Sequence, residues 1–167
     1  NQASEALNHR GPDDSGFWQD DTSHVLLAHR RLSIVDLSEL GHQPMHFPDC
    51  GLTIVFNGEI YNHSDLRTEL QSLGHRFRSQ TDTEVLLAAY AQWGIGCLER
   101  LNGMFAFALY DELSRKVFLA RDRAGEKPLF YRFERGTLYF ASELKALLVH
   151  PDLPRKIDSR AFDCFLA

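Results

Sequence analysis

The sequence lacks the features that mark several broad classes of protein. Its 167 residues contain no apolar run that approaches the ~20 residues needed to cross a bilayer. The net charge is −5 and the basic residues are scattered, so no basic patch for nucleic acid is present. The three cysteines, Cys50, Cys97 and Cys164, match neither a disulfide framework nor a metal-binding Cys-x-x-Cys pattern. We therefore expect a cytoplasmic protein with no membrane or nucleic-acid partner.

Two weaker signals of ligand binding are also incomplete. His42 and His46 lie four residues apart, but Pro44 between them prevents the shared helical face that metal-binding pairs often use. The charged stretch 121–127 contains a glycine but lacks the spacing of a phosphate-binding loop. The sequence thus predicts neither a metal site nor a cofactor in this domain.

The composition, 44% hydrophobic and 25% charged, is typical of one globular domain with a substantial core. Residues Gly103–Asp111 are apolar on both faces, which predicts an interior strand of a sheet that is covered on both sides. The strands that follow are closely spaced, and close spacing favours antiparallel pairing, so we predict an α+β fold. Strands are predicted at 16–19, Val25–Arg31, 53–56, near Phe77, and at Gly103–Asp111, Lys116–Arg121, 129–133 and Thr137–Ala141. Helices are predicted at 62–74, 81–93, 95–101, 142–148 and Ser159–Leu166, the second of them with a capping box from Thr81 to Glu84. A long surface loop is predicted at 37–49.

The stretch 52–62, read LTIVFNGEIYN, is the one around which we expect the chain to be organised. Residues 53–56 have the pattern of a buried strand, and Asn57 and Gly58 follow at once. An Asn-Gly pair after a strand is typical of a tight hairpin. However, an amphipathic helix pattern follows here instead of a second strand. We therefore expect the strand to end at Asn57-Gly58, and these two residues and Glu59 to face a cleft.

Four polar residues could form a binding site together: Arg31, Asn57, Glu59 and Asp82. Each alone has an ordinary structural explanation, such as a charge at the end of a strand or at the start of a helix. Together they have a clear chemistry. A guanidinium suits a carboxylate, two carboxylates suit an ammonium, and an amide beside the Gly58 N–H can form an oxyanion hole. The set fits an amino acid that is attacked at its side-chain carbonyl.

Six segments carry a family resemblance: NHRGPDDSG, AHRRLSIVD, FNGEIYN, TDTE, GMFAFALYD and RDRAGEKPLFY. Over nearly its whole length, the sequence resembles the glutaminase domains of asparagine synthetases, which are class II glutamine amidotransferases among the N-terminal-nucleophile hydrolases. The resemblance implies a four-layer αββα sandwich of antiparallel sheets, here incomplete, and a site for L-glutamine. It implies that Arg31 binds the α-carboxylate, with the backbone of Leu32, Ser33, Ile34 and Val35 closing around it. It also implies that Glu59 and Asp82 hold the α-ammonium. The Asn57 side chain and the Gly58 N–H would receive the oxyanion.

The family's nucleophile has no counterpart in this sequence. In the family it is a cysteine at the mature N-terminus, whose own α-amine is the base, on a short strand that precedes a helix. Residues 1–9 here resemble the end of that helix, and none of the three cysteines matches the nucleophile. We therefore expect residues 1–167 to be a glutamine amidotransferase domain that lacks its N-terminal strand and its C-terminal end, and to be inactive by itself.

The resemblance also implies a partner domain and leaves alternatives open. It places ATP and Mg²⁺ in a C-terminal synthetase domain of the same polypeptide, which would make asparagine from aspartate with the ammonia released from glutamine. A homodimer is left open. The same glutaminase module could instead serve another acceptor, such as a sugar or another carboxylate. A catalytically dead module that only binds glutamine is the third reading, and the sequence does not decide among the three.

Overall fold

The structure is a computed structural model that describes residues 2–33, 36, 38–157 and 159–166. Its strands are β1 (Asp14–Asp20), β2 (Val25–Arg31), β3 (Met45–Phe47), β4 (Leu52–Ile60), β5 (Gly103–Asp111), β6 (Lys116–Arg121), β7 (Phe130–Glu134) and β8 (Thr137–Ala141). Its helices are α1 (Gln2–Glu5), α2 (His63–Ser72), α3 (Asp82–Trp93), α4 (Leu144–Leu148) and α5 (Ser159–Leu166), with 3₁₀ turns at Asn8–Arg10, Glu39–Gly41, Pro48–Cys50 and Gly94–Glu99. Among the described residues, no helix is both long and apolar enough to span a bilayer.

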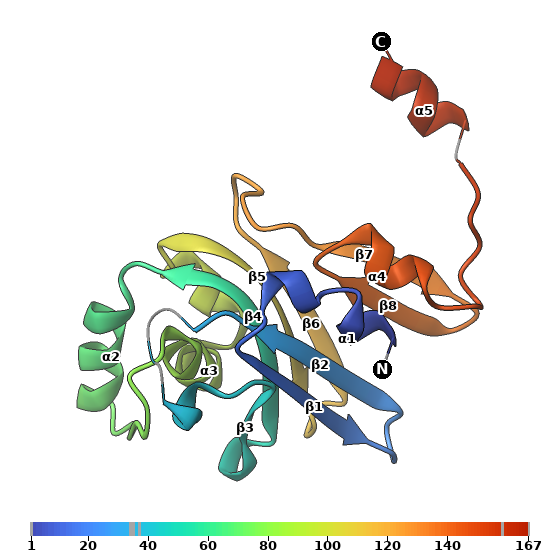
Figure 1. The fold of residues 1–167 in the computed structure, drawn as a ribbon. Helices are drawn as coiled ribbons and strands as arrows, with labels where there is room; N and C mark the ends of the chain where they lie inside the picture. Colours follow the sequence, from blue (N-terminus) through green and yellow to red (C-terminus); the bar gives the residue numbers. More distant parts are fainter. Residues whose placement is uncertain (1, 34–35, 37, 158, 167) are drawn as a thin grey trace.

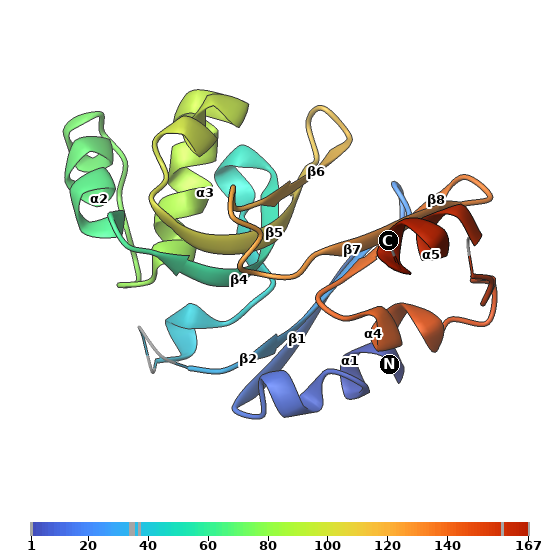
Figure 2. The same cartoon turned by 90° about the horizontal axis from the view of Figure 1, so that it is seen from above.

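The elements stack in four layers, helix, sheet, sheet and helix, as Figure 2 shows from above. Helices α2 and α3 cover the four-stranded antiparallel sheet β3-β4-β5-β6, and the two-stranded sheets β1-β2 and β7-β8 form the next layer. The short helices α1 and α4 lie on the outer side of that layer, whereas α5 stands apart from the body (Figure 1). The predicted α+β sandwich of antiparallel sheets is thereby confirmed.

The core lies on both faces of β4 and β5. Phe56, Phe107 and Leu109 pack with residues of α2 and α3, and Val55 and Tyr110 pack on the other side with residues of β2. The prediction of an interior strand at Gly103–Asp111 is confirmed, because β5 lies between β4 and β6 and is buried along most of its length. This arrangement holds the middle of β4 between two layers.

The predicted break at Asn57-Gly58 is wrong. β4 runs through both residues to Ile60, and Gly58 lies opposite Phe105 of β5. A Cβ on Gly58 would lie 2.3 Å from the carbonyl oxygen of Met104. The glycine therefore serves a close approach of two backbones rather than a turn, and a paired strand overrides the turn preference of Asn-Gly.

Two other local predictions are wrong because a partner from elsewhere in the chain decides the structure. The described part of the region 37–49 is not a plain loop, since it contains β3, which pairs with β4, the 3₁₀ turn Glu39–Gly41 and the start of a second one. No strand is present near Phe77; its ring lies instead under the guanidinium of Arg67, 4.4 Å from the ring centroid to the guanidinium carbon. Both regions took their structure from contacts that a short sequence window does not contain.

The capping box at the start of α3 is only half formed. Thr81 accepts a hydrogen bond from the Glu84 N–H at 3.2 Å, as predicted. The carboxylate of Glu84 does not return to Thr81, however, and accepts instead from the N–H groups of Arg78 (2.8 Å) and Ser79 (2.7 Å). Glu84 thus fixes the chain that leads into α3 and, with it, the N-terminal end of the helix.

Two hydrogen bonds join the facing sheets. Nε2 of His29 in β2 donates to the carbonyl of Phe56 in β4 at 3.0 Å, and the hydroxyl of Tyr110 in β5 donates to the carboxylate of Asp20 in β1 at 3.0 Å. Burial lowers the pKa of His29 from 6.5 to about 4. His29 is therefore a neutral, buried hydrogen-bond donor between the layers.

The burial of His29 predicts a pH dependence of stability. Between pH 6.5 and about pH 4 the unfolded chain protonates His29 and the folded chain does not, so the free energy of unfolding falls as the pH falls through this window. The contribution of this residue is up to about 3 kcal/mol. Urea unfolding at pH 7 and pH 4.5 measures this fall in the free energy of unfolding, which should be smaller for His29→Gln than for the unaltered protein. An equal fall in both proteins would contradict the expectation.

Candidate active site

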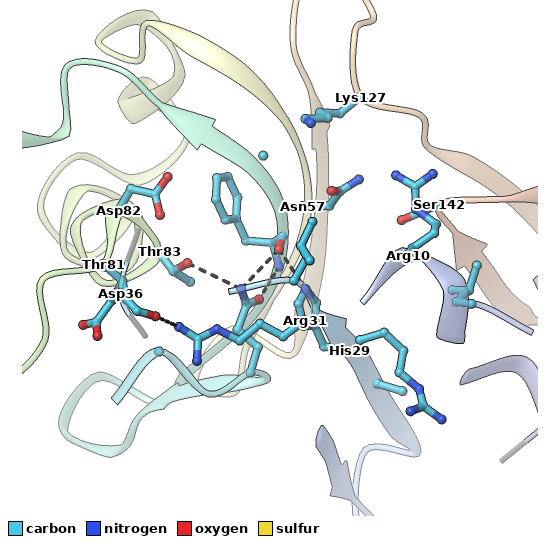
Figure 3. Close-up of a pocket in the computed structure, with 18 residues that line it drawn as sticks. Arg10, His29, Arg31, Asp36, Asn57, Thr81, Asp82, Thr83, Lys127 and Ser142 are labelled. Carbon is cyan, nitrogen blue, oxygen red and sulfur yellow. Dashed lines mark hydrogen bonds between the residues drawn. The ribbon is translucent and has the colours of Figure 1, made fainter. Parts of the chain in front are cut away.

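A cavity of about 270 Å³ opens between the two sheets, at the N-terminal end of α3 and beside the connection from β6 to β7 (Figure 3). Its lining combines side chains of both charges with backbone of β4. The lining residues are Leu7, Arg10, Ala28, His29, Arg30, Arg31, Leu32, Asp36, Gly41, Gln43, Phe56, Asn57, Gly58, Thr81, Asp82, Thr83, Lys127 and Ser142.

Asp82 provides a buried negative charge at one end of the cavity. It is the first residue of α3, is only 5% exposed, and accepts a hydrogen bond from the Ile60 N–H at 3.0 Å. Burial raises the pKa of Asp82 above its ordinary value, although the Ile60 N–H acts in the opposite direction. No salt bridge among the described residues includes Asp82. A cationic group in the cavity would relieve this cost of desolvation.

Arg31 provides the opposite charge from the end of β2. Arg31 is 8% exposed, and its guanidinium donates to the backbone carbonyls of Ser38, at 3.0 Å, and Asp36. Gly41 gives it room, because a Cβ at that position would lie 2.0 Å from Nη2. Arg31 and Asp82 therefore face the same cavity without pairing with each other, each held by neutral backbone groups.

Asn57 and Gly58 lie on the cavity wall in the middle of β4. The Nδ2 of Asn57 is buried and has no hydrogen-bond partner among the described residues. A buried donor without a partner costs about 1–3 kcal/mol, so this amide is ready for an acceptor that enters the cavity. The Gly58 backbone lies next to it on the same wall.

The structure brings together most of the residues predicted from the sequence. Figure 3 shows Arg31, Asn57 and Asp82 around the same space, and Leu32 and Gly58 also line the cavity. Two predicted positions are placed differently. Ser33 is not among the lining residues, and its N–H donates to the Asp13 carboxylate at 2.8 Å. Glu59 follows Gly58 on β4, half-buried and also outside the lining. Ile34 and Val35 lie outside the described residues.

The cavity contains several residues to which the sequence analysis gave no role there: Arg10, His29, Gln43, Lys127 and Ser142. Arg10 is oriented by Glu143, whose carboxylate accepts from Nη1 at 3.0 Å. Gln43 and Lys127 each precede a proline, which keeps a residue out of helical conformations. That is a weak local signal, and it says nothing of the cavity that these side chains reach.

A second, larger groove of about 700 Å³ borders the cavity. It lies along β2 and β8, with α1 and α4 on its outer side, and its lining is mostly apolar. His29, Phe56, Asn57 and Ser142 line both the groove and the cavity. Asn57 thus stands where the two spaces meet.

None of the three cysteines lines the cavity or the groove. Cys97 is fully buried in the core beside α3, and burial raises the pKa of its thiol to about 11. Cys50 lies in the 3₁₀ turn before β4, and Cys164 is exposed on α5.

Comparisons with known proteins identify a family for this chain. The family described as the glutamine amidotransferase domain matches residues 1–167. The chain is 49% identical to asparagine synthetase [glutamine-hydrolyzing] 3 of Bacillus subtilis over 92% of its length, and 45% identical to a putative asparagine synthetase [glutamine-hydrolyzing] of Mycobacterium bovis over 96%. It spans only 25% and 26% of these relatives.

A solved structure shows the same fold. The glutamine phosphoribosylpyrophosphate amidotransferase of B. subtilis superposes with a TM-score of 0.73 at 22% identity, over 88% of this chain and 39% of that one. The fold is therefore the four-layer sandwich of the N-terminal-nucleophile hydrolases. With the family match over all 167 residues, the chain belongs to the glutamine amidotransferase domain family.

Proposed function

We propose that this domain binds L-glutamine, hydrolyses its side-chain amide and passes the ammonia to a synthetase domain of the same polypeptide, which makes asparagine from aspartate with ATP and Mg²⁺. One observation carries the proposal. A single cavity contains an unpaired buried carboxylate at Asp82, a guanidinium at Arg31 and an unsatisfied amide donor at Asn57. Relatives of which the chain spans about a quarter are named for glutamine hydrolysis and asparagine synthesis, which supports the proposal.

The cavity suits the two charged ends of an amino acid. In the proposed complex Arg31 pairs with the α-carboxylate, next to Leu32 on the cavity wall. Asp82, assisted by Glu59, holds the α-ammonium. Because the two protein charges do not neutralise each other, both stay available for a zwitterion. The side chain of glutamine then extends along the wall toward Asn57 and Gly58.

The chemistry proposed is acyl transfer through a thioester. A cysteine thiolate adds to the glutamine carbonyl carbon, and the carbonyl oxygen becomes an oxyanion that accepts from Asn57 Nδ2–H and the Gly58 N–H. The C–N bond then breaks, and ammonia leaves with the proton that the α-amine of the cysteine had taken from the thiol. Water attacks the thioester through a second oxyanion and releases glutamate and the free thiol.

The groove along β2 and β8 supports a nucleophile supplied from outside residues 1–167. Both strands border it, its lining is apolar, and it opens onto the cavity at Asn57. We propose that a strand of the same polypeptide that precedes α1 lies in this groove and carries an N-terminal cysteine to Asn57. The free thiols of Cys50, Cys97 and Cys164 fit the reducing conditions of the cytoplasm.

The nucleophile is tested first. The 167-residue chain alone should release no ammonia from glutamine above a buffer blank, and the full-length protein should release it readily. Changing the proposed N-terminal cysteine to Ala should abolish release, whereas the controls Cys50→Ser and Cys164→Ser should keep it, since neither thiol lines the cavity. Loss of activity in a control variant would show that the nucleophile is assigned wrongly.

Asn57→Ala should lower the glutamine-dependent rate of the full-length protein about a hundredfold, because one oxyanion donor is lost. Synthesis supplied with free ammonia should stay nearly unchanged, since it bypasses this site. The exposed Asn102 offers a matched control, and Asn102→Ala should change neither rate. Equal loss of both activities would indicate that Asn57 acts in folding instead. An unchanged glutamine-dependent rate would contradict the oxyanion role of Asn57, and a full-length protein with only the ammonia-dependent rate would favour a module that only binds glutamine.

Asp82→Asn should raise the KM for glutamine by roughly tenfold to a hundredfold, the worth of a charge-assisted hydrogen bond. The kcat should change less, because this contact holds substrate and transition state alike. Arg31→Lys should act in the same direction, although it also loses the contacts to the carbonyls of Asp36 and Ser38. Asp65→Asn, an exposed acid in the first turn of α2, is the control. A lower melting temperature with a normal KM would refute the proposed role of Asp82 and Arg31 in binding glutamine.

A further inference from the structure

Phe56, the residue before Asn57, has both of its backbone groups held by side chains. Oε1 of Gln43 accepts from the Phe56 N–H at 2.6 Å, and Nε2 of Gln43 donates to the Phe56 carbonyl at 3.2 Å. Nε2 of His29 donates to the same carbonyl at 3.0 Å. Gln43 approaches from the β3 edge of its sheet and His29 from the facing sheet. Both contacts end on the peptide that joins Phe56 to Asn57.

The Gln43 side chain continues a strand pairing that the backbone does not make. β3 pairs with β4 at Met45 opposite Ile54, and the same register, extended by two residues, places Gln43 opposite Phe56. β3 begins only at Met45, so no backbone ladder reaches Phe56 from this edge. A side-chain amide offers one acceptor and a donor in the place of a peptide. β4 therefore keeps partners on both edges as far as the residue before Asn57.

His29 has a defined tautomer in this contact. A carbonyl only accepts, so Nε2 of His29 carries the proton that it donates to Phe56. Nδ1 is buried and without a partner among the described residues, and burial holds the pKa of the ring near 4. The ring is thus neutral at physiological pH, with its one N–H directed at the Phe56 carbonyl.

The surroundings of Gln43 are fitted to its position. Gln43 is 6% exposed, and its Nε2 also lies 3.5 Å from the hydroxyl oxygen of Thr83 in α3. The backbone carbonyl of Gln43 packs against Gly16, and a Cβ added to Gly16 would lie 1.9 Å from that carbonyl oxygen. Gly16 in turn lies opposite His29 in the pairing of β1 with β2. Elements from both sheets and from α3 therefore meet around Gln43.

We propose that Gln43 and His29 are positioning residues for the oxyanion site, because they fix the peptide between Phe56 and Asn57 and so aim the Asn57 carboxamide and the Gly58 N–H. This rests on the proposed function, in which those two donors receive the oxyanion. Such donors act only when they are oriented before the charge develops. A displacement of ~1 Å costs on the order of a hundredfold in rate. Loss of either contact should therefore lower kcat and leave KM unchanged.

The test uses three variants of the full-length protein and one control. His29→Leu and Gln43→Met remove the hydrogen bonds, His29→Gln keeps an N–H donor near the position of Nε2, and Gln71→Met changes an exposed glutamine on α2. We expect the first two to lower kcat for ammonia release from glutamine about tenfold to a hundredfold, with KM within about twofold. His29→Gln should recover most of the rate, and Gln71→Met should match the unaltered protein.

Two further measurements separate positioning from a merely structural role. Combined with Asn57→Ala, each variant should cost less than it does alone, because the donor that it positions is gone. Deuterium exchange at residues 56–58 should be faster in His29→Leu and Gln43→Met than in Gln71→Met. Fully multiplicative losses in the double variants, or faster exchange with no loss of kcat, would overturn the proposal. Failure of the unaltered protein to hydrolyse glutamine would refute the proposed function. Unchanged deuterium exchange at residues 56–58 in the variants would refute the positioning role, whether or not glutamine is hydrolysed.

Discussion

The site depends on the pairing of β4 with partners on both of its edges. β5 pairs with β4 along its full length, and the close approach at Gly58 leaves no room for a side chain there. On the other edge β3 and then the Gln43 side chain continue the contacts to Phe56. Asn57 therefore projects from a strand whose backbone is fixed immediately before and after it. A site on a paired strand is held more rigidly than one on a loop.

The charges of the cavity are arranged for a ligand with both signs of charge. Arg31 is held by the carbonyls of Asp36 and Ser38, and Asp82 by the N–H of Ile60. Dipoles stabilise a buried charge without cancelling it, so each residue can still form an ion pair with an incoming group. Had Arg31 and Asp82 formed a salt bridge, a zwitterionic amino acid would have had to break it at a cost close to its own binding energy.

The sequence predicted those features that depend on neighbouring residues. The apolar run of β5, the amphipathic pattern of α2 and the helix start at Thr81 are local signals, and the structure has all three elements there. The break at Asn57-Gly58 was wrong because β5, more than 40 residues later, pairs across it. The contacts of Glu84 and Gln43 were also missed, although their partners lie closer in the sequence. Each carries a side chain to backbone of another segment, and no periodicity records such a contact.

Within the candidate site, too, some residues could be identified from the sequence and others only from contacts between segments. Arg31, Asn57 and Asp82 could be named because their residue types suit the charged and carbonyl groups of an amino acid, although Asn57 lies within β4 and not at its end. His29 and Gln43 could not be assigned to the cavity, since a neutral buried histidine and a glutamine before a proline have many ordinary roles. Their relevance follows only from the shared target, the carbonyl of Phe56. Such contacts between side chains and a distant backbone carbonyl depend on how the layers pack, and the whole chain determines that packing.

The position of Asn57 at the junction of cavity and groove also bears on how such a site can be assembled. The cavity contains the charges suited to the amino-acid end of glutamine, and the apolar groove is suited to a strand. Substrate and nucleophile would thus reach Asn57 from different sides, and neither would need to cross the other. The oxyanion donors, fixed in β4 by contacts within residues 1–167, would be preorganised whether or not the nucleophile is in place. Catalysis in the proposed enzyme would then require only that the strand in the groove bring one sulfur atom to a site that is already formed.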